Sequence, residues 1–597
     1  MSSDCSQVSS SSTSMRPSPR QKGHSSSSRI PVPPHSSQVT GFLLLIAHRT
    51  LAEVRGVPEG GGASDRNALR MLVRVIGLSR ESVKAVDSGP GGCRPPAAGA
   101  AGEPRRAARA RAASGLLLPL DRVEREEVQL ARGLPALSLV GLAGAATRES
   151  RERVCGALRE SGFELPAGRV TVNLAPAEEP KEGSAFDLPM ALGLLEVSGQ
   201  LRPRRGRDWW FLGELGLDGR LLPLRGALPL GLAALGGGAA GLVLPMGNLA
   251  EAAYLEGLPL LPLGSLREAV DWLEGRAAGG VRPAPPLAGR TAPLAPLLLP
   301  GGSALRRALA AAAVGGHNLL LLGAPGNGKS TLARSLAALL PPLDRRERRE
   351  VMALRSAAGL AVDGSRCRPF RAPHHSLSLA GLLGRQGAGA RPGELSLAHR
   401  GLLFLDELPE YHRDVLEALR EPLEEGSLVV SRGAGSLRWP ARFQLVAAMN
   451  PCPCGQSLRG REHCRCTPGQ VQRYRARISG PLLDRIDLIL ELPAWRPGDP
   501  NAWLGAEGQR ALGRRILRAR RRLRGWGASD PAPADQDWLD RRLAEVGASY
   551  RQRLKLTGIA RSLAALDGRP RAGRAELLEA LDLGLRWRLA LRDPPVA

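Results

Sequence analysis

The chain has few aromatic residues and no long apolar run, and each shortage excludes a class of function. Aromatic residues make up 3% of the 597 residues, so a surface of rings that stack on single-stranded nucleic acid is not expected. The longest apolar stretch near the amino terminus, residues 42–47, is far shorter than the roughly 18 residues of a membrane span. A serine-rich stretch precedes it and no clear cleavage site follows, so the sequence predicts neither a membrane segment nor a secretory signal.

Cysteine and lysine are scarce as well. The eight cysteines do not form a secreted framework, because the chain is large and four of them stand in two Cys-x-Cys pairs. We therefore expect a cytoplasmic protein. Lysine supplies five of the 83 basic residues and arginine the rest. The net charge of +26 suits a polyanionic partner such as DNA, although a chain so rich in Arg, Ala, Gly and Pro also fits biased coding.

Composition divides the chain into five parts. Residues 1–118 contain serine runs and an Ala-, Arg-, Gly- and Pro-rich stretch, so we expect a disordered extension or, alternatively, a nucleic-acid-binding tail. Residues 119–280 alternate short strands and helices, with strands at 137–140 and 169–174 and helices at 147–161 and 188–195. A proline-rich linker is expected over residues 281–299, a second α/β domain over residues 300–495 and a helical tail over residues 496–597.

A phosphate-binding motif stands between an apolar run and a helix in the second domain. The run, residues 317–322, suits a buried parallel strand, and the helix, residues 331–340, ends before two prolines. Glycines let backbone N–H groups curl around phosphates at the start of a helix. Lys329 is predicted to reach the β- and γ-phosphates of ATP, and Ser330 to hold Mg²⁺. The predicted nucleotide-binding residues are Gly323, Ala324, Pro325, Gly326, Asn327, Gly328, Lys329, Ser330 and Thr331.

Polar residues end two further predicted strands. Residues 401–405 lead into Asp406, which is expected to bind Mg²⁺ through its hydration shell, and Glu407, which is expected to polarise the attacking water. Residues 443–449 end in Asn450, which would position that water, although an asparagine at a strand end is also a common turn former.

Two arginines are selected by position alone, because 78 arginines make the residue type uninformative. Arg485 precedes an expected strand, where it would face the nucleotide of a neighbouring subunit and stabilise charge in the transition state. Arg561 lies in the helical tail, from which it would fold back on the nucleotide. Both are hypotheses about catalytic residues.

In this order, these residues resemble an AAA+ ATPase, and longer strings are similar to the magnesium-chelatase-like ComM/YifB family. The strings are Arg368-Pro-Phe-Arg-Ala-Pro-His-His-Ser376, Pro392-Gly-Glu-Leu-Ser-Leu-Ala-His399, Phe443-Gln-Leu-Val-Ala-Ala-Met-Asn-Pro451 and, in the first domain, Lys181-Glu-Gly-Ser-Ala-Phe-Asp-Leu-Pro189. The resemblance covers residues 120–590. It implies a Lon-protease-like, ribosomal S5-like α/β domain, then an AAA+ P-loop ATPase α/β domain and a C-terminal helical lid.

The resemblance also implies a function. Members of the family form rings, here expected to be hexamers, and the best-understood role is ATP-driven DNA branch migration in natural transformation; recombination would use the same motor. One alternative is a magnesium chelatase motor subunit that inserts Mg²⁺ into a porphyrin. The other is a Lon-like protease, in which Ser184 would be the nucleophile. Residues 222–229, where its lysine base belongs, contain no lysine, so we expect no peptidase activity.

Several basic segments are candidates for contact with single-stranded or branched DNA. Residues 427–439 read as a β-hairpin with a glycine tip that Arg432 and Arg438 would flank; an ordinary surface hairpin is the alternative. Residues 366–378 contain arginines and a His-His pair. We expect this segment to serve either in packing or in phosphate contact. The arginine-rich helix 509–524 is either a DNA face or a solvated helix face.

The second domain also contains a candidate metal site. Two Cys-x-Cys pairs stand nine residues apart, and four thiolates suit a tetrahedral structural Zn²⁺. Free thiols are the alternative. The predicted ligands are Cys452, Cys454, Cys464 and Cys466.

Overall fold

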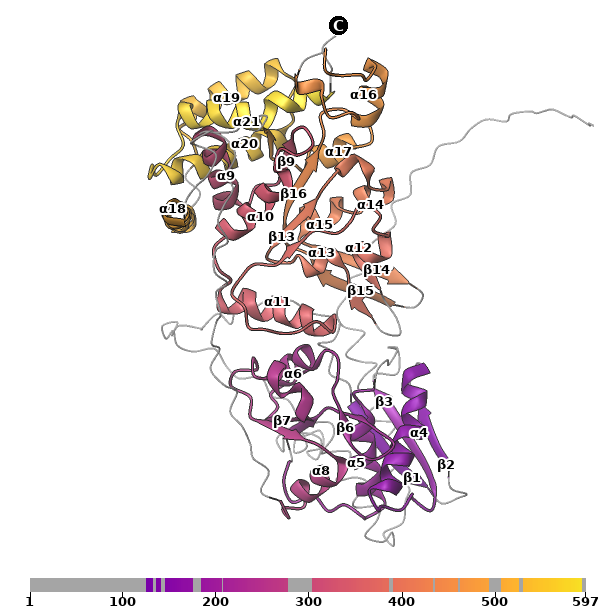
Figure 1. Cartoon of the computed structure of the whole chain (residues 1–597). Coiled ribbons are helices and arrows are strands. Elements are labelled where there is room, and N and C mark those ends of the chain that lie inside the picture. The colour runs from indigo at the N-terminus through magenta and orange to yellow at the C-terminus, as the bar shows by residue number, and fades with distance from the viewer. Residues whose placement is uncertain are drawn as a thin grey trace, which may run out of the picture. The chain divides into compact units, whose positions relative to one another are not determined.

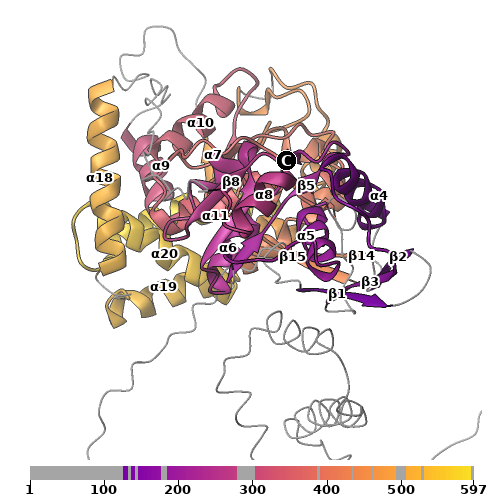
Figure 2. The same ribbon diagram turned by 90° about the horizontal axis from the view of Figure 1, so that it is seen from below.

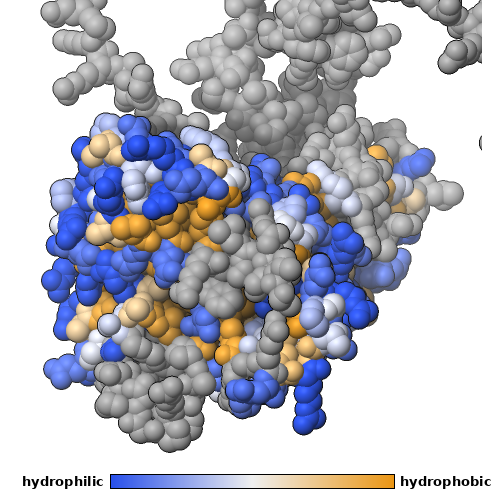
Figure 3. Space-filling view, turned by 90° about the horizontal axis from the view of Figure 1, so that it is seen from above, coloured by the Kyte–Doolittle hydropathy of each residue, from blue (hydrophilic) through white to orange (hydrophobic). Residues whose placement is uncertain are grey.

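The computed structural model describes residues 125–592 with internal gaps (Figure 1). The predicted extension, linker and hairpin tip lie outside the described residues, as does Lys181. None of the helices described is both long and apolar enough to cross a membrane. Hydrophilic side chains dominate the face shown in Figure 3, with apolar strips between them. The gaps are residues 132–135, 141–144, 176–183, 207, 278–302, 386–389, 433–434, 460–461, 493–505 and 526–529.

The first folded domain contains two three-stranded sheets. One has the order β1 (Arg125–Ala131), β3 (Arg169–Ala175), β2 (Ala136–Val140), in which β1 is antiparallel and β2 parallel to β3. The other is parallel, with the order β4 (Trp209–Phe211), β7 (Gly241–Pro245), β8 (Leu260–Leu263). The remaining elements are α4 (Ala145–Glu160), α5 (Asp187–Val197), β5 (Glu214–Leu215), β6 (Leu221–Leu222), α6 (Ala227–Gly236), η1 (Met246–Asn248), α7 (Leu249–Ala252) and α8 (Leu266–Leu273). The strands and helices predicted at the start of this domain are confirmed.

A five-stranded parallel sheet forms the centre of the second domain. Its order is β10 (Phe370–Arg371), β13 (Leu402–Leu405), β16 (Gln444–Met449), β9 (Leu319–Leu322), β17 (Leu488–Glu491). All neighbouring strands pair in parallel. The loops that follow β9, β13 and β16 therefore meet at one edge of the sheet, where ligands of parallel α/β sheets bind.

Strand β9 is apolar throughout because both faces of this sheet are covered. Leu319 and Leu321 point into a core built with α9 (Ser303–Gly315), α18 (Ala506–Gly525) and α20 (Tyr550–Leu566). Leu320 and Leu322 point into the opposite core. Side chains alternate along a strand, so four consecutive leucines supply two layers.

The sheet is connected and covered by short helices and two small antiparallel strand pairs. These elements are α10 (Lys329–Leu339), α11 (Arg345–Ala357), α12 (Leu379–Leu383), β11 (Gly384–Arg385) with β12 (Arg391–Pro392), α13 (Glu394–Leu397), η2 (Leu408–Glu410), α14 (Arg413–Glu417), α15 (Arg420–Glu425), β14 (Ser427–Arg432) with β15 (Gly435–Pro440), η3 (Ser457–Arg459), α16 (Pro468–Arg475), α17 (Gly480–Leu483), α19 (Pro533–Glu545) and α21 (Arg574–Arg592).

The arginine-rich helix α18 lies beside α9 and α20 (Figure 2). Three of its arginines donate hydrogen bonds to carbonyl groups at the carboxyl ends of the neighbouring helices, where cations are favoured. Burial lowers the pKa of one of them, Arg520, to about 10. Arg520 and Arg522 are half-buried in these contacts, which neither predicted alternative describes, whereas the Arg515 side chain stays 54% exposed, as on a solvated helix face. The bonds are Arg515 to Leu566 at 3.2 Å, Arg520 to Ala313 at 3.1 Å and Arg522 to Ala565 at 3.4 Å.

A buried ionic cluster ties α11 to the start of β13. The Glu350 carboxylate accepts hydrogen bonds from Arg400 Nε at 2.7 Å and from His399 Nε2 at 3.3 Å. The backbone N–H of Arg442 donates to His399 Nδ1 at 3.0 Å, which leaves the proton of the neutral ring on Nε2. Burial raises the pKa of Glu350, but the hydrogen bonds from His399 and Arg400 outweigh it and lower that pKa to about 2.

We expect Glu350→Gln to lower the free energy of unfolding of this domain by about 3 kcal/mol at pH 7, because it leaves Arg400 without its anionic partner. The folded-state pKa lies below the ordinary 4.5, so the carboxylate stabilises the fold above that pH and its contribution disappears as the pH falls toward about 2. Urea unfolding should show that the free energies of unfolding of the wild type and of Glu350→Gln differ less at pH 3 than at pH 7. The exposed Glu545→Gln is the matched control, expected to cost less than about 1 kcal/mol; a constant difference at both pH values would contradict the prediction.

Candidate nucleotide site

The predicted glycine loop connects β9 to α10. Gly326 and Gly328 have φ values of 81° and 76°, in the left-handed region that glycine adopts without strain. Helix α10 begins at Lys329, and no side chain caps its first turn. Its backbone N–H groups and the amino end of its dipole are therefore available to an anion, as a phosphate site requires.

Lys329 is held by three oxygen atoms at the mouth of the loop. Its Nζ donates to the carbonyl groups of Gly323 at 2.9 Å and Ala324 at 3.0 Å, and to Asn450 Oδ1 at 3.0 Å. Burial lowers the pKa of Lys329, and the carboxylates of Asp406 and Glu407 oppose that shift. The bond to Asn450 joins the ends of β9 and β16, so the structure brings these two predicted residues together.

Ser330 follows β9 and Asp406 follows β13, and the two side chains meet across the end of β16, the strand between these two. Ser330 Oγ donates to Asp406 Oδ2 at 2.7 Å. A hydroxyl and a carboxylate are hard oxygen ligands of the kind that Mg²⁺ prefers. The two side chains therefore fit the predicted Mg²⁺ site.

Glu407 has an uncommon backbone conformation. Its φ of 51° places a non-glycine residue in the left-handed region, a strain that clusters at functional sites. Its N–H donates to Asp406 Oδ1 at 3.0 Å. Its Oε2 lies 3.7 Å from His375 Nδ1, and the rings of His374 and His375 have centroids 4.0 Å apart. No spacing rule connects His375 with Glu407 along the chain, and the fold adds this histidine to the residues of the site.

Arg485 follows α17 and is 9% exposed. Its guanidinium forms an ion pair with Glu424 at 2.7 Å and donates to the carbonyl groups of Arg420 at 3.1 Å and Pro481 at 2.7 Å. Arg551 also pairs with Glu424. Arg485 is thus anchored within its own chain.

Arg561 is not brought to the nucleotide loop of its own chain. The next residue of α20, Ser562, contacts His317 Nε2 at 2.9 Å, just before β9 begins. Lys555 on the same helix binds Asp487 at 2.7 Å, just before β17 begins. Helix α20 therefore passes the amino ends of the strands, whereas the loop follows their carboxyl ends. These contacts place the helix that carries Arg561 at the other end of the strands from the glycine loop, and the role predicted for Arg561 at the nucleotide stays a prediction.

The hairpin predicted over residues 427–439 is present as β14 and β15. Arg432 ends β14 opposite Gly435, next to the tip. Arg438 stands opposite Val429, and its guanidinium donates to Ser427 Oγ near the base, at 3.0 and 2.9 Å. The prediction that Arg438 flanks the tip is wrong, because the strand register places it three pairs away.

The arginines of the 366–378 string are engaged with the protein. The Arg368 side chain is 7% exposed and donates hydrogen bonds to the Pro341 carbonyl at 2.6 Å and to Glu347 at 2.8 Å. Arg371 forms two parallel bonds with Glu394, both at 2.6 Å. These side chains hold loops of the second domain together, which favours packing over phosphate contact, the two roles expected for this segment.

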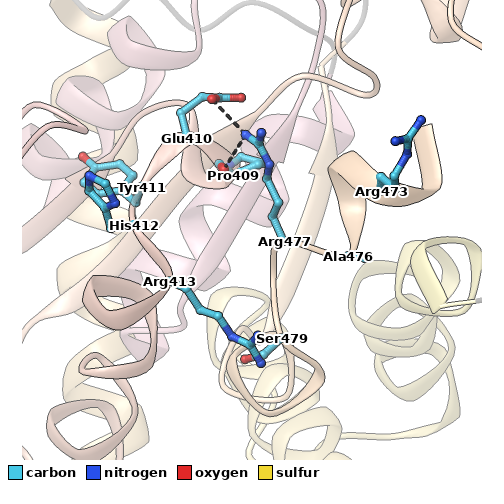
Figure 4. Close-up of a pocket in the computed structure, with 9 residues that line it drawn as sticks. All are labelled: Pro409, Glu410, Tyr411, His412, Arg413, Arg473, Ala476, Arg477 and Ser479. Atoms are coloured by element: carbon cyan, nitrogen blue, oxygen red, sulfur yellow. Dashed lines mark hydrogen bonds and ion pairs between the residues drawn. The ribbon is translucent and has the colours of Figure 1, made fainter. Parts of the chain in front are cut away.

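A cavity of about 620 Å³ opens beside the turn that follows Glu407 (Figure 4). Arg477 donates to the Glu410 carboxylate at 2.9 Å and to the Pro409 carbonyl at 3.1 Å. No residue of the glycine loop lines this cavity, so the cavity is not the predicted phosphate site. The lining residues are Pro409, Glu410, Tyr411, His412, Arg413, Arg473, Ala476, Arg477 and Ser479.

The four predicted zinc ligands form one cluster. The Sγ atoms of Cys452, Cys454, Cys464 and Cys466 all lie within 4.8 Å of one another, and none of these cysteines is in a disulfide. Cys452 is buried and the other three are half-buried. The cluster stands between the end of β16 and the start of α16.

The phosphate loop after β9 and the acidic pair after β13, in a parallel sheet of this order, define a P-loop ATPase of the AAA type. Comparison with known proteins agrees. The sequence profile "Magnesium chelatase, subunit ChlI" matches residues 299–499, and "Subunit ChlI of Mg-chelatase" matches residues 126–248.

Relatives match most of the chain. It is 40% identical over 496 residues to the uncharacterized protein YifB of Escherichia coli, which covers 79% of this chain and 95% of YifB. It is 38% identical over 499 residues to the competence protein ComM of Haemophilus influenzae, covering 79% and 96%. It is 30% identical over 299 residues to the magnesium-chelatase 38 kDa subunit of Rhodobacter capsulatus, covering 46% and 81%. The chain belongs to the magnesium-chelatase ChlI-like family of AAA ATPases, with YifB and ComM, and the resemblance seen in the sequence is confirmed.

Proposed function

We propose that this chain is a cytoplasmic motor that hydrolyses ATP at the loop after β9 and uses the energy to move DNA. The observation that carries the catalytic part is the convergence of three strand ends. Lys329 contacts Asn450, and Ser330 contacts Asp406. Groups from separate strands thereby surround the space above the glycine loop.

The proposed hydrolysis assigns one task to each group. Backbone N–H groups and Lys329 bind the phosphates, and Asn450 orients the water. Ser330 and Asp406 would hold Mg²⁺, which when bound neutralises phosphate charge. Glu407 accepts a proton from water while the water oxygen bonds to the γ-phosphorus. The bond from that phosphorus to the β–γ bridging oxygen breaks, releasing ADP and phosphate.

Three observations support DNA as the partner. The net charge is +26, and the β14–β15 hairpin carries arginines along its length. The relative ComM is named a competence protein. We infer branch migration on single-stranded or branched DNA, in transformation or recombination.

Exposed apolar side chains on the helical lid support assembly into a homo-oligomeric ring, a hexamer in our proposal. Tyr550 is 71% exposed, and Leu554, one turn further along α20, is 53% exposed. Leu578 on α21 is 51% exposed. Contact with a neighbouring subunit would remove these side chains from water.

ATP turnover with different partners tests this proposal. Turnover by the full chain should rise when a synthetic four-way DNA junction is added. The rival function, a magnesium chelatase motor, is favoured by the likeness to the 38 kDa subunit. No response to DNA together with stimulation by a porphyrin-binding chelatase subunit would overturn the DNA motor in favour of that rival.

A protease role is the remaining alternative, and the structure gives Ser184 an acidic partner. Its hydroxyl donates to the carboxylate of Glu214. A carboxylate in that place is not the lysine base that a Ser–Lys peptidase requires. We expect the full chain to leave casein intact with ATP present, and Ser184→Ala to leave ATP turnover unchanged. Casein cleavage that Ser184→Ala abolishes would contradict this.

A further inference from the structure

The spacing of the four cysteine sulfurs matches a tetrahedral metal site. Three of the Sγ–Sγ distances are 3.4 Å, from Cys452 to Cys454, and 3.6 Å, from each of these to Cys464. A tetrahedron with Zn–S bonds of about 2.3 Å has sulfur atoms about 3.8 Å apart. The fourth sulfur, of Cys466, accepts a hydrogen bond from the backbone N–H of Cys454 at 3.4 Å. Hydrogen bonds of this kind, to the atom that binds the metal, orient metal ligands.

The segment that carries the first cysteine pair also contacts the nucleotide loop. Asn450, two residues before Cys452, binds Lys329 Nζ at 3.0 Å. Gly455, directly after Cys454, packs against Pro325 so closely that a Cβ atom there would lie 2.4 Å from Pro325 Cδ. The cysteine cluster therefore lies between two contacts with the loop, one on each side of the pair.

We propose that the four cysteines hold a structural Zn²⁺ and that this ion braces the nucleotide loop through Asn450 and Gly455. Four protein ligands leave no open position, so the ion has no part in the chemical step. The ion cross-links the strand end at Asn450 to the start of α16, and so fixes the backbone against which Pro325 and Lys329 rest. This proposal has two parts: that the cysteines bind Zn²⁺, the metal half, and that the ion fixes the nucleotide loop, the bracing half. The bracing half rests on the proposed nucleotide site, whereas the metal half does not.

The metal half is tested on the full chain, purified under reducing conditions from cells grown with zinc. Elemental analysis should find one zinc ion per wild-type chain and none in the Cys464→Ser/Cys466→Ser double variant. Cys367→Ser is the matched control, because Cys367 is exposed and outside the cluster, and it should keep the ion. Cobalt exchanged into the wild type should give the visible absorption of a four-thiolate tetrahedral site. A wild-type chain without zinc and without that absorption would overturn the proposal.

The bracing half is tested by titrating a fluorescent ADP analogue into wild type, into wild type stripped by a chelator, and into stripped protein with Zn²⁺ restored. This reversible comparison stays informative if the double variant fails to fold. Stripping should weaken binding on the order of 10-fold to 100-fold, and Zn²⁺ should restore it. Equal affinity with and without zinc would overturn the bracing. Zinc-loaded wild type that binds no nucleotide would instead overturn the proposed nucleotide site and leave the metal site standing.

Discussion

Glu407→Gln is expected to bind ATP like the wild type and to hydrolyse it on the order of 10²-fold to 10⁴-fold more slowly. The amide keeps the shape of the side chain and removes the group that accepts the proton of water. Lys329, Ser330 and Asp406 remain in place to hold the nucleotide and Mg²⁺. Steady-state phosphate release measures turnover, and equilibrium binding of a fluorescent ATP analogue measures affinity.

Glu410→Gln is the matched control for this prediction. Glu410 stands three residues later and pairs with Arg477, away from the nucleotide loop. Its turnover should stay close to that of the wild type. If Glu407→Gln hydrolysed ATP as fast as Glu410→Gln, Glu407 would not be the base.

Arg485→Ala is expected to bind ATP nearly normally and to lose turnover on the order of 10³-fold, if Arg485 acts on a neighbouring subunit's nucleotide. In the structure, the Arg485 guanidinium is already paired with Glu424 at 2.7 Å, so this ion pair must break before Arg485 can act on a neighbour. To reach a neighbour, it must exchange that carboxylate for phosphate oxygens. The alternative is a purely structural ion pair between α15 and the residues that follow α17.

Two comparisons separate these roles. Glu424→Ala removes the same ion pair and keeps the arginine, so turnover well above that of Arg485→Ala indicates a catalytic arginine. Mixing Arg485→Ala with Lys329→Ala places some intact Lys329 sites beside an intact Arg485. Those interfaces should regain hydrolysis. Mixed rings that form and stay inactive would show that Arg485 does not act in trans.

The nucleotide site was predictable because its parts depend on local rules. A strand that is buried on both faces must be apolar throughout, which identifies residues 319–322. The glycine loop follows directly, and its left-handed glycines at 326 and 328 are required by the turn. The carboxyl ends of parallel strands meet at one edge, so the polar residues after 405 and 449 had to lie near that loop.

The other arginines depend on contacts between residues far apart in the sequence. The partners of Arg368 and Arg371 are Glu347 and Glu394, which no spacing rule connects to them. Helical periodicity shows that α20 has a buried face, but it does not show which end of the sheet Arg561 passes. The error at Arg438 came from strand register, which the glycine tip alone does not fix.

Strand exchange on a mobile four-way junction tests whether ATP hydrolysis at this loop moves DNA. Fluorescent labels on two arms report conversion of the junction to duplexes. We expect conversion by the wild type and by Glu410→Gln with ATP and Mg²⁺, and none by Glu407→Gln. A wild-type protein that hydrolyses ATP normally and leaves every junction intact would contradict this expectation.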